Sequence, residues 1–300
     1  SEARRRTGLI SKATSLGPAE TMEVAMTFLA ELWLRGAPGH DRSTALRRLH
    51  DLSGEGEHDF LLALQVHGLI STAPPFSVAE NQIASSLIAD WLRRQQDRDW
   101  AAGLAATASD DPITHFVQYS PDDTVCWCDA VSQVLPERNS ALCAGIGRRR
   151  SVGFGELGFV VGLARSADRR IAFAPACEAL GKLAVTLKPA RLLVERMFLE
   201  GTPNERIRGA IAVGHGFPGD PDWGKDLILR SLQEEQLSRF RSKRDLSTWI
   251  SSSLHAASHV QYPLALDEMR ALIRRLQLHP RVADTAREEL TWLRGAWEIA

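Results

Sequence analysis

The sequence is poor in cysteine and carries no excess charge of either sign. Its 300 residues include 36 Lys and Arg against 37 Asp and Glu, a formal net charge of -1, so no global field attracts nucleic acid or an acidic membrane. The net charge does not exclude local charged patches. The cysteines contain no Cys-x-x-Cys pair and no histidines at zinc-finger spacing, which predicts reduced thiols in a cytoplasmic protein. They are Cys126, Cys128, Cys143 and Cys177.

Long apolar runs are also missing. No stretch reaches the roughly 18 apolar residues that a membrane-spanning helix needs, and the start Ser1-Glu-Ala-Arg-Arg-Arg6 has no apolar region behind it, as a secretory signal would. We therefore expect no membrane partner. Because the first residue is Ser and not Met, we expect a chain that was processed, tagged or cut from a longer one. Hydrophobic residues make up 44% of the sequence, enough for one elongated unit or two compact units.

Catalytic signatures are absent from the sequence. It has no Gly-x-Ser-x-Gly elbow, and the glycine-rich stretch 145–155 lacks the strand and the Gly-Lys-Ser/Thr ending of a P-loop. This stretch is predicted to be a solvated loop, with contact to a polyanion as the alternative. A metal-dependent phosphohydrolase needs further ligands besides His-Asp pairs, so helix capping or exposure explains the three such pairs more simply. These pairs are His40-Asp41, His50-Asp51 and His58-Asp59. The sequence thus predicts no catalytic, cofactor-binding or metal-binding residue and no cofactor, and it favours a non-enzymatic protein.

The first third of the chain has the element order of a winged-helix domain, with three helices followed by a short hairpin. Asp41 or Ser43 would cap the second helix, and Pro74-Pro75 would turn the chain between two strands. We expect this domain over residues 19–108. The segment Ser109-Asp-Asp-Pro112 combines a composition break with a proline and marks the expected boundary. The predicted elements are a linker over 1–18, helices over 22–33, 43–52 and 60–66, strands over 71–73 and 76–78, and helices over 80–94 and 100–108.

The remainder, residues 109–300, is predicted to be an α-helical repeat domain. The segment 169–185 anchors the pattern, because its alanines would let a neighbouring helix approach closely while Leu180 and Leu183 fill the space between layers. A similar segment follows over 204–213, within the period of helical solenoids. The fold class is therefore expected to be mainly α, a winged-helix-like N-terminal domain followed by a HEAT-like α-helical repeat array. A compact helical bundle is the alternative for the second half. Helices are expected over 113–119, 122–135, 138–147, 155–165, 168–185, 189–200, 204–215, 222–239, 245–258, 263–277 and 280–298.

Arginines are the main candidates for contacts with a partner. Between Gly54 and Gly68, where a DNA-reading helix would present Arg, Lys, Asn or Gln, the chain has no Lys or Arg, which favours a helix that faces protein. The eight tryptophans mostly fall on apolar stripes and favour core packing. A HEAT-like DNA glycosylase, whose basic groove uses tryptophans and an aspartate, is the alternative. The candidate contacts to a polyanion or a partner are Arg42, Arg47, Arg48, Arg148, Arg149 and Arg150.

The order helix, winged helix, helical repeats, with the runs Leu61–Ile70 and Phe76–Leu92, resembles the C-terminal half of a signal-transduction ATPase of the STAND (NACHT/NB-ARC-like) class. In that family a winged helix follows the ATPase core, and a repeat array serves as the sensor. The hydrophobic-His-Asp motif of the family would fall on Val78, Ala79 and Glu80. Alanine then replaces the nucleotide-sensing histidine, so the resemblance does not imply direct contact with ADP. The chain has no Walker A or B motif, and the ATPase core is expected outside it.

Two functional classes follow. The resemblance implies a non-catalytic interaction or sensor module of a larger signalling or defence ATPase. Its expected partners are another protein or other domains of a longer chain, with nucleic acid as a further option and oligomerisation left open. The alternative is a nucleic-acid-binding winged-helix/HEAT-repeat protein, including the HEAT-like DNA glycosylase. Steep salt dependence of duplex DNA binding would separate the two classes.

Overall fold

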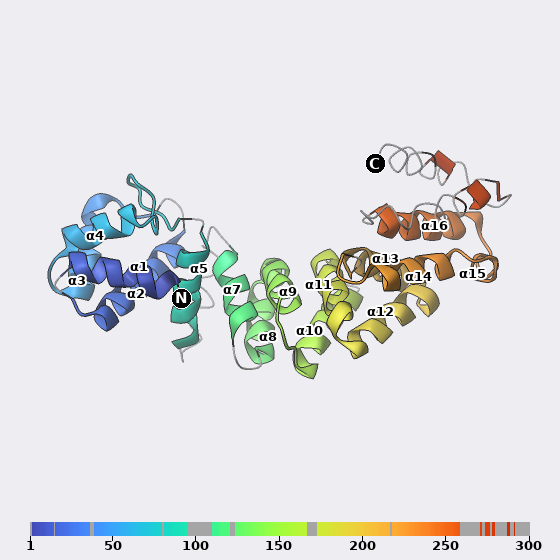
Figure 1. The fold of residues 1–300 in the computed structure, drawn as a ribbon, viewed down its shortest axis with the longest axis horizontal. Coiled ribbons are helices and arrows are strands. Elements are labelled where there is room, and N and C mark those ends of the chain that lie inside the picture. The colour runs from blue at the N-terminus through green and yellow to red at the C-terminus, as the bar shows by residue number, and fades with distance from the viewer. Residues whose placement is uncertain are drawn as a thin grey trace. The chain divides into compact units, whose positions relative to one another are not determined.

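The fold is given by a computed structural model (Figure 1). It describes residues 2–14, 16–36, 39–79, 81–94, 110–120, 124–166, 173–216 and 218–258, with a few positions beyond. The chain divides into two compact units, Ser1–Gly145 and Ile146–Ala300. Over the described ranges the elements are helices and isolated β-bridges, which confirms the predicted mainly α class.

Helix α2 lies at the centre of the first unit. It packs against α1, α3 and α5, and Phe28 and Leu29 are fully buried. Pro18 occupies its first turn, where the missing N–H costs least, and Glu20 Oε2 accepts a hydrogen bond from Gly17 N at 3.1 Å. The elements of this unit are α1 (Glu2–Ala13), α2 (Pro18–Arg35), α3 (Arg42–Ser53), α4 (Glu57–Val66), α5 (Gln82–Arg94), α7 (Asp111–Tyr119), α8 (Val125–Val134) and the 3-10 helix η2 (Pro136–Arg138), and α9 (Asn139–Gly147) crosses into the second unit.

The segment between α2 and α3 pairs with the segment that follows α4. His40 N donates to Phe76 O at 3.0 Å, and Phe76 N donates to His40 O at 2.6 Å. A second antiparallel bridge joins Ile70 and Val78. The two strands predicted around the proline turn are therefore reduced to single bridges within the part of the chain that is described.

Two residues beside the first bridge fix the chain locally. Gly39 has a φ of +83°, and a Cβ at this position would lie 2.1 Å from Phe76 O, so both the backbone conformation and the close approach require glycine. Asp41 Oδ1 accepts a hydrogen bond from Thr44 N at 2.7 Å and caps α3, as the sequence predicts.

Residues 1–18, expected to be a linker, contain helix α1 instead. α1 packs against α2, α4 and α5, and the side chain of Ile10 is fully buried. The helix contains Thr7, Gly8 and Ser11, which are poorer helix formers than alanine, so its own helical preference is weak. Packing against the other three helices supplies the stability that the local sequence lacks.

Seven helices follow α9 within the described residues 154–258 of the second unit. Pro189, Pro203 and Pro221 occupy the first turns of three of them, as predicted. The single helix expected over 222–239 is two helices, separated at Leu232 and Gln233. The helices are α10 (Phe154–Arg165), α11 (Phe173–Thr186), α12 (Lys188–Glu200), α13 (Pro203–Gly216), α14 (Pro221–Ser231), α15 (Glu234–Ser238) and α16 (Lys243–Ser258).

Helix α13 is the centre of the second unit. It packs against α10, α11, α12, α14 and α16, and glycines bring the backbones together at two of these contacts. A Cβ on Gly181 of α11 would lie 2.0 Å from Ala212 O of α13, and a Cβ on Gly209 of α13 would lie 2.7 Å from Phe198 N of α12. Small residues thus permit close helix packing, as expected for this part of the chain.

The compact units do not coincide with the expected domains. The boundary expected near residue 109 lies inside the first unit, which extends to Gly145 and includes α7 and α8. α5 packs against α7 within that unit. The helices expected over 100–108, 263–277 and 280–298 lie wholly or largely outside the described residues, and the assignment of domains to 19–108 and 109–300 stays a prediction.

Candidate interaction surfaces

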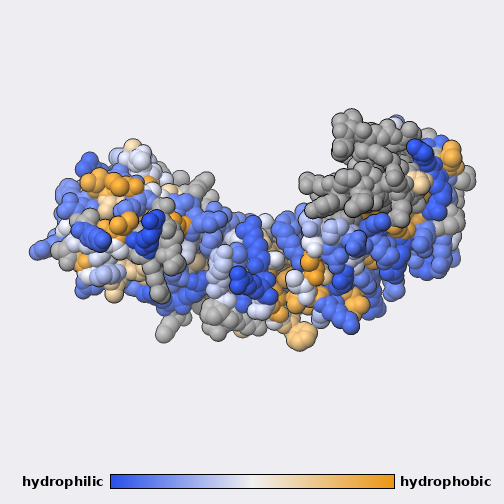
Figure 2. All heavy atoms as spheres, in the orientation of Figure 1, coloured by the Kyte–Doolittle hydropathy of each residue, from blue (hydrophilic) through white to orange (hydrophobic). Residues whose placement is uncertain are grey.

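Helix α4 has one face in the core of the first unit and one face in solvent. Phe60 and Leu64 are fully buried, whereas Leu62 and Val66 are 58% and 72% exposed. These two side chains are four residues apart and lie on the same side of the helix. Figure 2 shows apolar surface in the region where Figure 1 places α4. Adjacent exposed aliphatic side chains of this kind are candidates for contact with another protein.

Acidic side chains lie in the first turn of α4 and just before it. Glu55 and Asp59 are exposed, and Glu57 Oε2 lies 3.4 Å from His50 Nδ1. Hydrogen bonds from its own backbone N–H and from His50 lower the pKa of Glu57, so this carboxylate is charged at neutral pH. Glu55, Asp59, Leu62 and Val66 together are called the α4 surface below. It combines apolar and acidic side chains and contains no Lys or Arg.

Only two of the three candidate arginines on α3 are available to a partner. Arg42 and Arg47 are exposed. Arg48 is bound to Glu31 of α2 through two contacts, Nε to Oε2 at 2.6 Å and Nη2 to Oε1 at 2.5 Å. The side-chain hydrogen bond with Glu31 raises the pKa of Arg48. Arg48 therefore joins α2 to α3.

The loop between α9 and α10 also has two exposed arginines and one arginine in an internal ion pair. Arg148 and Arg150 are exposed, but the side chain of Arg149 is only 7% exposed, with Nη1 3.4 Å from Oε1 of Glu156. The Glu156 side chain is 1% exposed, and its Oε2 accepts a hydrogen bond from Gly153 N at 3.1 Å. Arg149 and Glu156 thus fix the loop.

A large apolar side chain stands at the end of this loop. Phe154, the first residue of α10, is 86% exposed. Phe154 was not among the site residues predicted from the sequence. The signal in the sequence was its position directly after an arginine- and glycine-rich loop. Glu156, three residues after Gly153, was the signal for the hydrogen bond from Gly153 N to its carboxylate.

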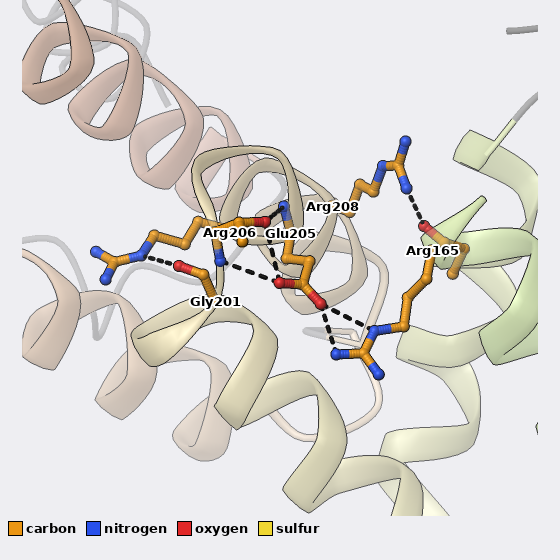
Figure 3. A network of polar contacts seen from close by, with 7 residues as sticks. Arg165, Gly201, Glu205, Arg206 and Arg208 are labelled. Carbon is orange, nitrogen blue, oxygen red and sulfur yellow. Dashed lines mark hydrogen bonds and ion pairs between the residues drawn. The ribbon is translucent and has the colours of Figure 1, made fainter. Parts of the chain in front are cut away.

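Charged residues at the start of α13 connect it to α10 (Figure 3). Glu205 Oε1 accepts hydrogen bonds from Arg165 Nε at 2.9 Å and Nη2 at 2.5 Å, and its Oε2 accepts one from Thr202 N at 3.0 Å. The hydrogen bonds from the Thr202 backbone and from Arg165 lower the pKa of Glu205. Arg208 donates to Ala164 O and to Ser166 O, both at 2.9 Å. These contacts are internal to the second unit.

Arg206 extends the same network toward α16 (Figure 3). Its Nε donates to Gly201 O at 2.7 Å, and its guanidinium carbon lies 5.0 Å from the ring centre of Phe240 and 5.4 Å from that of Trp249. Burial, with a smaller contribution from Arg239, lowers the pKa of Arg206. The guanidinium therefore packs on aromatic rings and is not part of an exposed basic surface.

The His-Asp pairs do not converge. His40 is 7% exposed, Asp41 caps α3, and His50 and His58 are exposed. Hydrogen bonds from the Thr44 backbone and from Ser43 lower the pKa of Asp41 to about 2. Over the described residues, no group of three or more His, Cys, Asp or Glu side chains is placed to hold a metal ion.

Three of the cysteines and several tryptophans are buried in the core. None of the four cysteines forms a disulfide; Cys126 is exposed and the other three are buried. Burial raises the pKa of Cys177 to about 12, so this thiol is unreactive at neutral pH. Trp33, Trp223 and Trp249 are at most 7% exposed, as core packing predicts. Trp100, Trp292 and Trp297 lie outside the described residues.

Comparison with known proteins finds no relative. No protein-family model matches the chain, and no curated protein and no solved structure is significantly similar to it. Among the helices that are described, none is long and apolar enough to cross a membrane.

Proposed function

We propose that the chain is a non-catalytic interaction module, the winged-helix and helical-repeat sensor part of a larger signalling or defence ATPase of the STAND class. The order of elements in the first unit supports a winged helix. α2 is followed by the bridge residue His40, then by α3 and α4, and then by the hairpin with Ile70 and Phe76. In a winged helix the strand after the first helix pairs with the hairpin in this way.

The α4 surface carries the proposal. α4 occupies the place of the recognition helix, which in a DNA reader presents Arg, Lys, Asn or Gln to base edges. Here its solvent face presents Leu62 and Val66, at 58% and 72% exposure, beside Glu55 and Asp59. Carboxylates repel phosphates, and exposed aliphatic side chains gain free energy when a protein partner covers them. The proposed occupant is the ATPase core or another subunit.

The packing of the second unit supports a HEAT-like array. Successive helices pack on one another, α10 on α11, α11 on α12 and α12 on α13. Helical repeats bury their apolar faces on neighbours in this way. Such an array offers the extended surface that a sensor domain needs.

Two experiments test this proposal. The first is the sequence of the full-length gene product that contains this chain, in which we expect a P-loop ATPase domain before Ser1. The second measures the labelling rate of a Val66→Cys variant by a maleimide, in a Cys126→Ser background that removes the exposed native thiol. If α4 faces a partner, labelling is at least about tenfold slower in the full-length protein than in the present chain.

A matched control uses Leu192→Cys on α12, which replaces another side chain that is 55% exposed. We expect its labelling rate to change little between the two proteins. If the full-length product has no P-loop domain, the proposal that this chain is part of an ATPase is wrong. Equal labelling of Val66→Cys in both proteins shows that the α4 surface is free and contradicts the interaction itself.

A further inference from the structure

The loop between α9 and α10, with the first residue of α10, exposes two cationic side chains and one aromatic ring. Arg148 and Arg150 are exposed, and Phe154 is 86% exposed. The acid that interacts with Arg148 is Glu178 of α11, whose Oε1 is already bound to Lys182 Nζ at 2.6 Å. The two guanidinium groups are therefore available to an external anion.

The base of the loop is held in place by contacts of Arg149, Glu156 and Gly147. Arg149 Nε donates to Ser151 O at 3.2 Å, and Glu156, which is 1% exposed, binds both Arg149 and the backbone of Gly153. A Cβ on Gly147 would lie 3.0 Å from Ala179 of α11, so the end of α9 is pressed against α11. A loop fixed in this way orders fewer groups when it binds, which lowers the entropic cost of binding.

We propose that Arg148, Arg150 and Phe154 form a contact site for single-stranded nucleic acid. Proteins that bind single strands without reading their sequence combine cations that contact the phosphates with exposed aromatic rings on which bases stack. The exposed ring of Phe154 can stack only on a base that is not already stacked within a duplex. The site therefore selects an unpaired strand, and it requires no groove-reading helix.

A membrane surface is the weaker partner for the same residues. Insertion into a lipid interface needs an amphipathic helix with a broad apolar face. The outer side of α10 beyond Phe154 carries Gly155, Gly158 and Gly162, which are exposed and offer almost no apolar side-chain area. A single phenylalanine is enough for one base, but not for a stable membrane anchor.

The test is fluorescence anisotropy with a labelled oligo(dT) or oligo(U) of about 12 nucleotides, a length within the range bound by small single-strand sites. Two phosphate contacts, each contributing about -0.7, predict a slope near -1.4 in a plot of log affinity against log salt. Replacement of both arginines by alanine brings this slope close to zero. Phe154→Ala weakens binding about tenfold and leaves the slope unchanged, whereas Phe154→Trp retains binding.

The matched control is the double variant Arg42→Ala/Arg47→Ala, which removes the same charge from two exposed arginines on α3 and should bind as the unchanged chain does. The proposal is overturned if the unchanged chain does not bind the oligonucleotide at low salt. It is equally overturned if Phe154→Ala binds as well as the unchanged chain, or if the α3 double variant loses as much affinity as the loop double variant. It is also overturned if a duplex of the same length binds more tightly, or if Phe154→Ala weakens only binding to phosphatidylserine vesicles. The site lies apart in sequence from the α4 surface, so Val66→Asp leaves oligonucleotide binding intact whether or not α4 binds a protein.

Discussion

Arg149 and Glu156 form an ion pair in which both side chains are almost fully buried, at 7% and 1% exposure, with 3.4 Å between Nη1 and Oε1. A buried ion pair adds little net stability, because desolvation offsets the attraction, but removal of one partner leaves the other charge unpaired. The pair is therefore best understood as fixing the loop between α9 and α10, which carries the exposed Arg148 and Arg150.

Loss of one partner of this pair should be costly. We expect Glu156→Gln to lower the free energy of unfolding by about 3 kcal/mol, because Arg149 then stays buried without a counter-charge. Urea denaturation followed by circular dichroism measures the change. The control is Glu178→Gln, whose exposed pair with Lys182 should contribute less than about 1 kcal/mol. Equal losses in the two variants contradict the assigned role of Glu156.

Replacement of both partners should be milder than replacement of one. In the double variant Arg149→Met/Glu156→Met no buried charge remains, so we expect it to be at least about 1 kcal/mol more stable than Glu156→Met alone. A double-mutant cycle measured by the same denaturation gives the coupling. If the two single losses simply add in the double variant, Arg149 and Glu156 do not act as a pair.

Two glycines should respond to alanine with opposite signs. In Gly181→Ala the new Cβ meets Ala212 O at 2.0 Å, so α11 and α13 must separate, at a cost of about 2 kcal/mol or more. In Gly162→Ala the new Cβ meets nothing within 4 Å, and the helix gains about 0.5–1 kcal/mol from the better helix former. The unfolding free energies of both variants test this contrast, and a stabilising Gly181→Ala would refute the close packing.

The stability of the first unit should fall at mildly acidic pH through His40. Burial, followed by repulsion from Arg35, lowers the pKa of His40 below its ordinary value of 6.5, and its Nδ1 has no hydrogen-bond partner among the described groups. The unfolded chain then binds a proton more readily than the folded chain. Above about pH 6.5 this difference has no effect; below it, stability is lost by up to about 1.4 kcal/mol per pH unit.

The measurement is the urea midpoint at about pH 7.5 and about pH 5.5, compared between the unchanged chain, His40→Gln and His58→Gln. The contribution of His40 disappears in His40→Gln, so this variant loses less stability on acidification than the unchanged chain. His58 is exposed, and His58→Gln should keep the full loss. The same acid sensitivity in all three proteins would rule out His40 as its source.

Capping residues and prolines in the sequence correctly predicted where several helices begin. Asp41 caps α3 as expected, and Pro189, Pro203 and Pro221 occupy first turns. α1 could not be predicted, because its stability comes from packing on α2, α4 and α5. The break between α14 and α15 has no glycine or proline. Distant donors stabilise it, since Trp249 Nε1 binds Ser231 O at 3.1 Å and Arg275 Nη2 binds Leu232 O at 2.9 Å.

The sequence predicted several residues of the candidate sites, but not which of their side chains face solvent. The sequence identified the arginines at 148–150, but not that Arg149 faces inward to Glu156, because the two residues belong to a loop and a helix whose packing the sequence does not encode locally. It also identified the absence of Lys and Arg on the third helix. It did not reveal that Leu62 and Val66 face solvent, because apolar residues occupy most positions from Phe60 to Val66 and no periodicity marks the outer face.

The close contact between Gly181 and Ala212 also constrains how the second unit is made on a ribosome. Domains are synthesised from the N-terminus, so α11 emerges before α13, which begins only at Pro203. Until then the face of α11 around Gly181 has no α13 to cover it. Chains that stall between Thr186 and Pro203 would therefore display that face to chaperones and proteases, and the core of this unit can close only after the codons of α13 have been read.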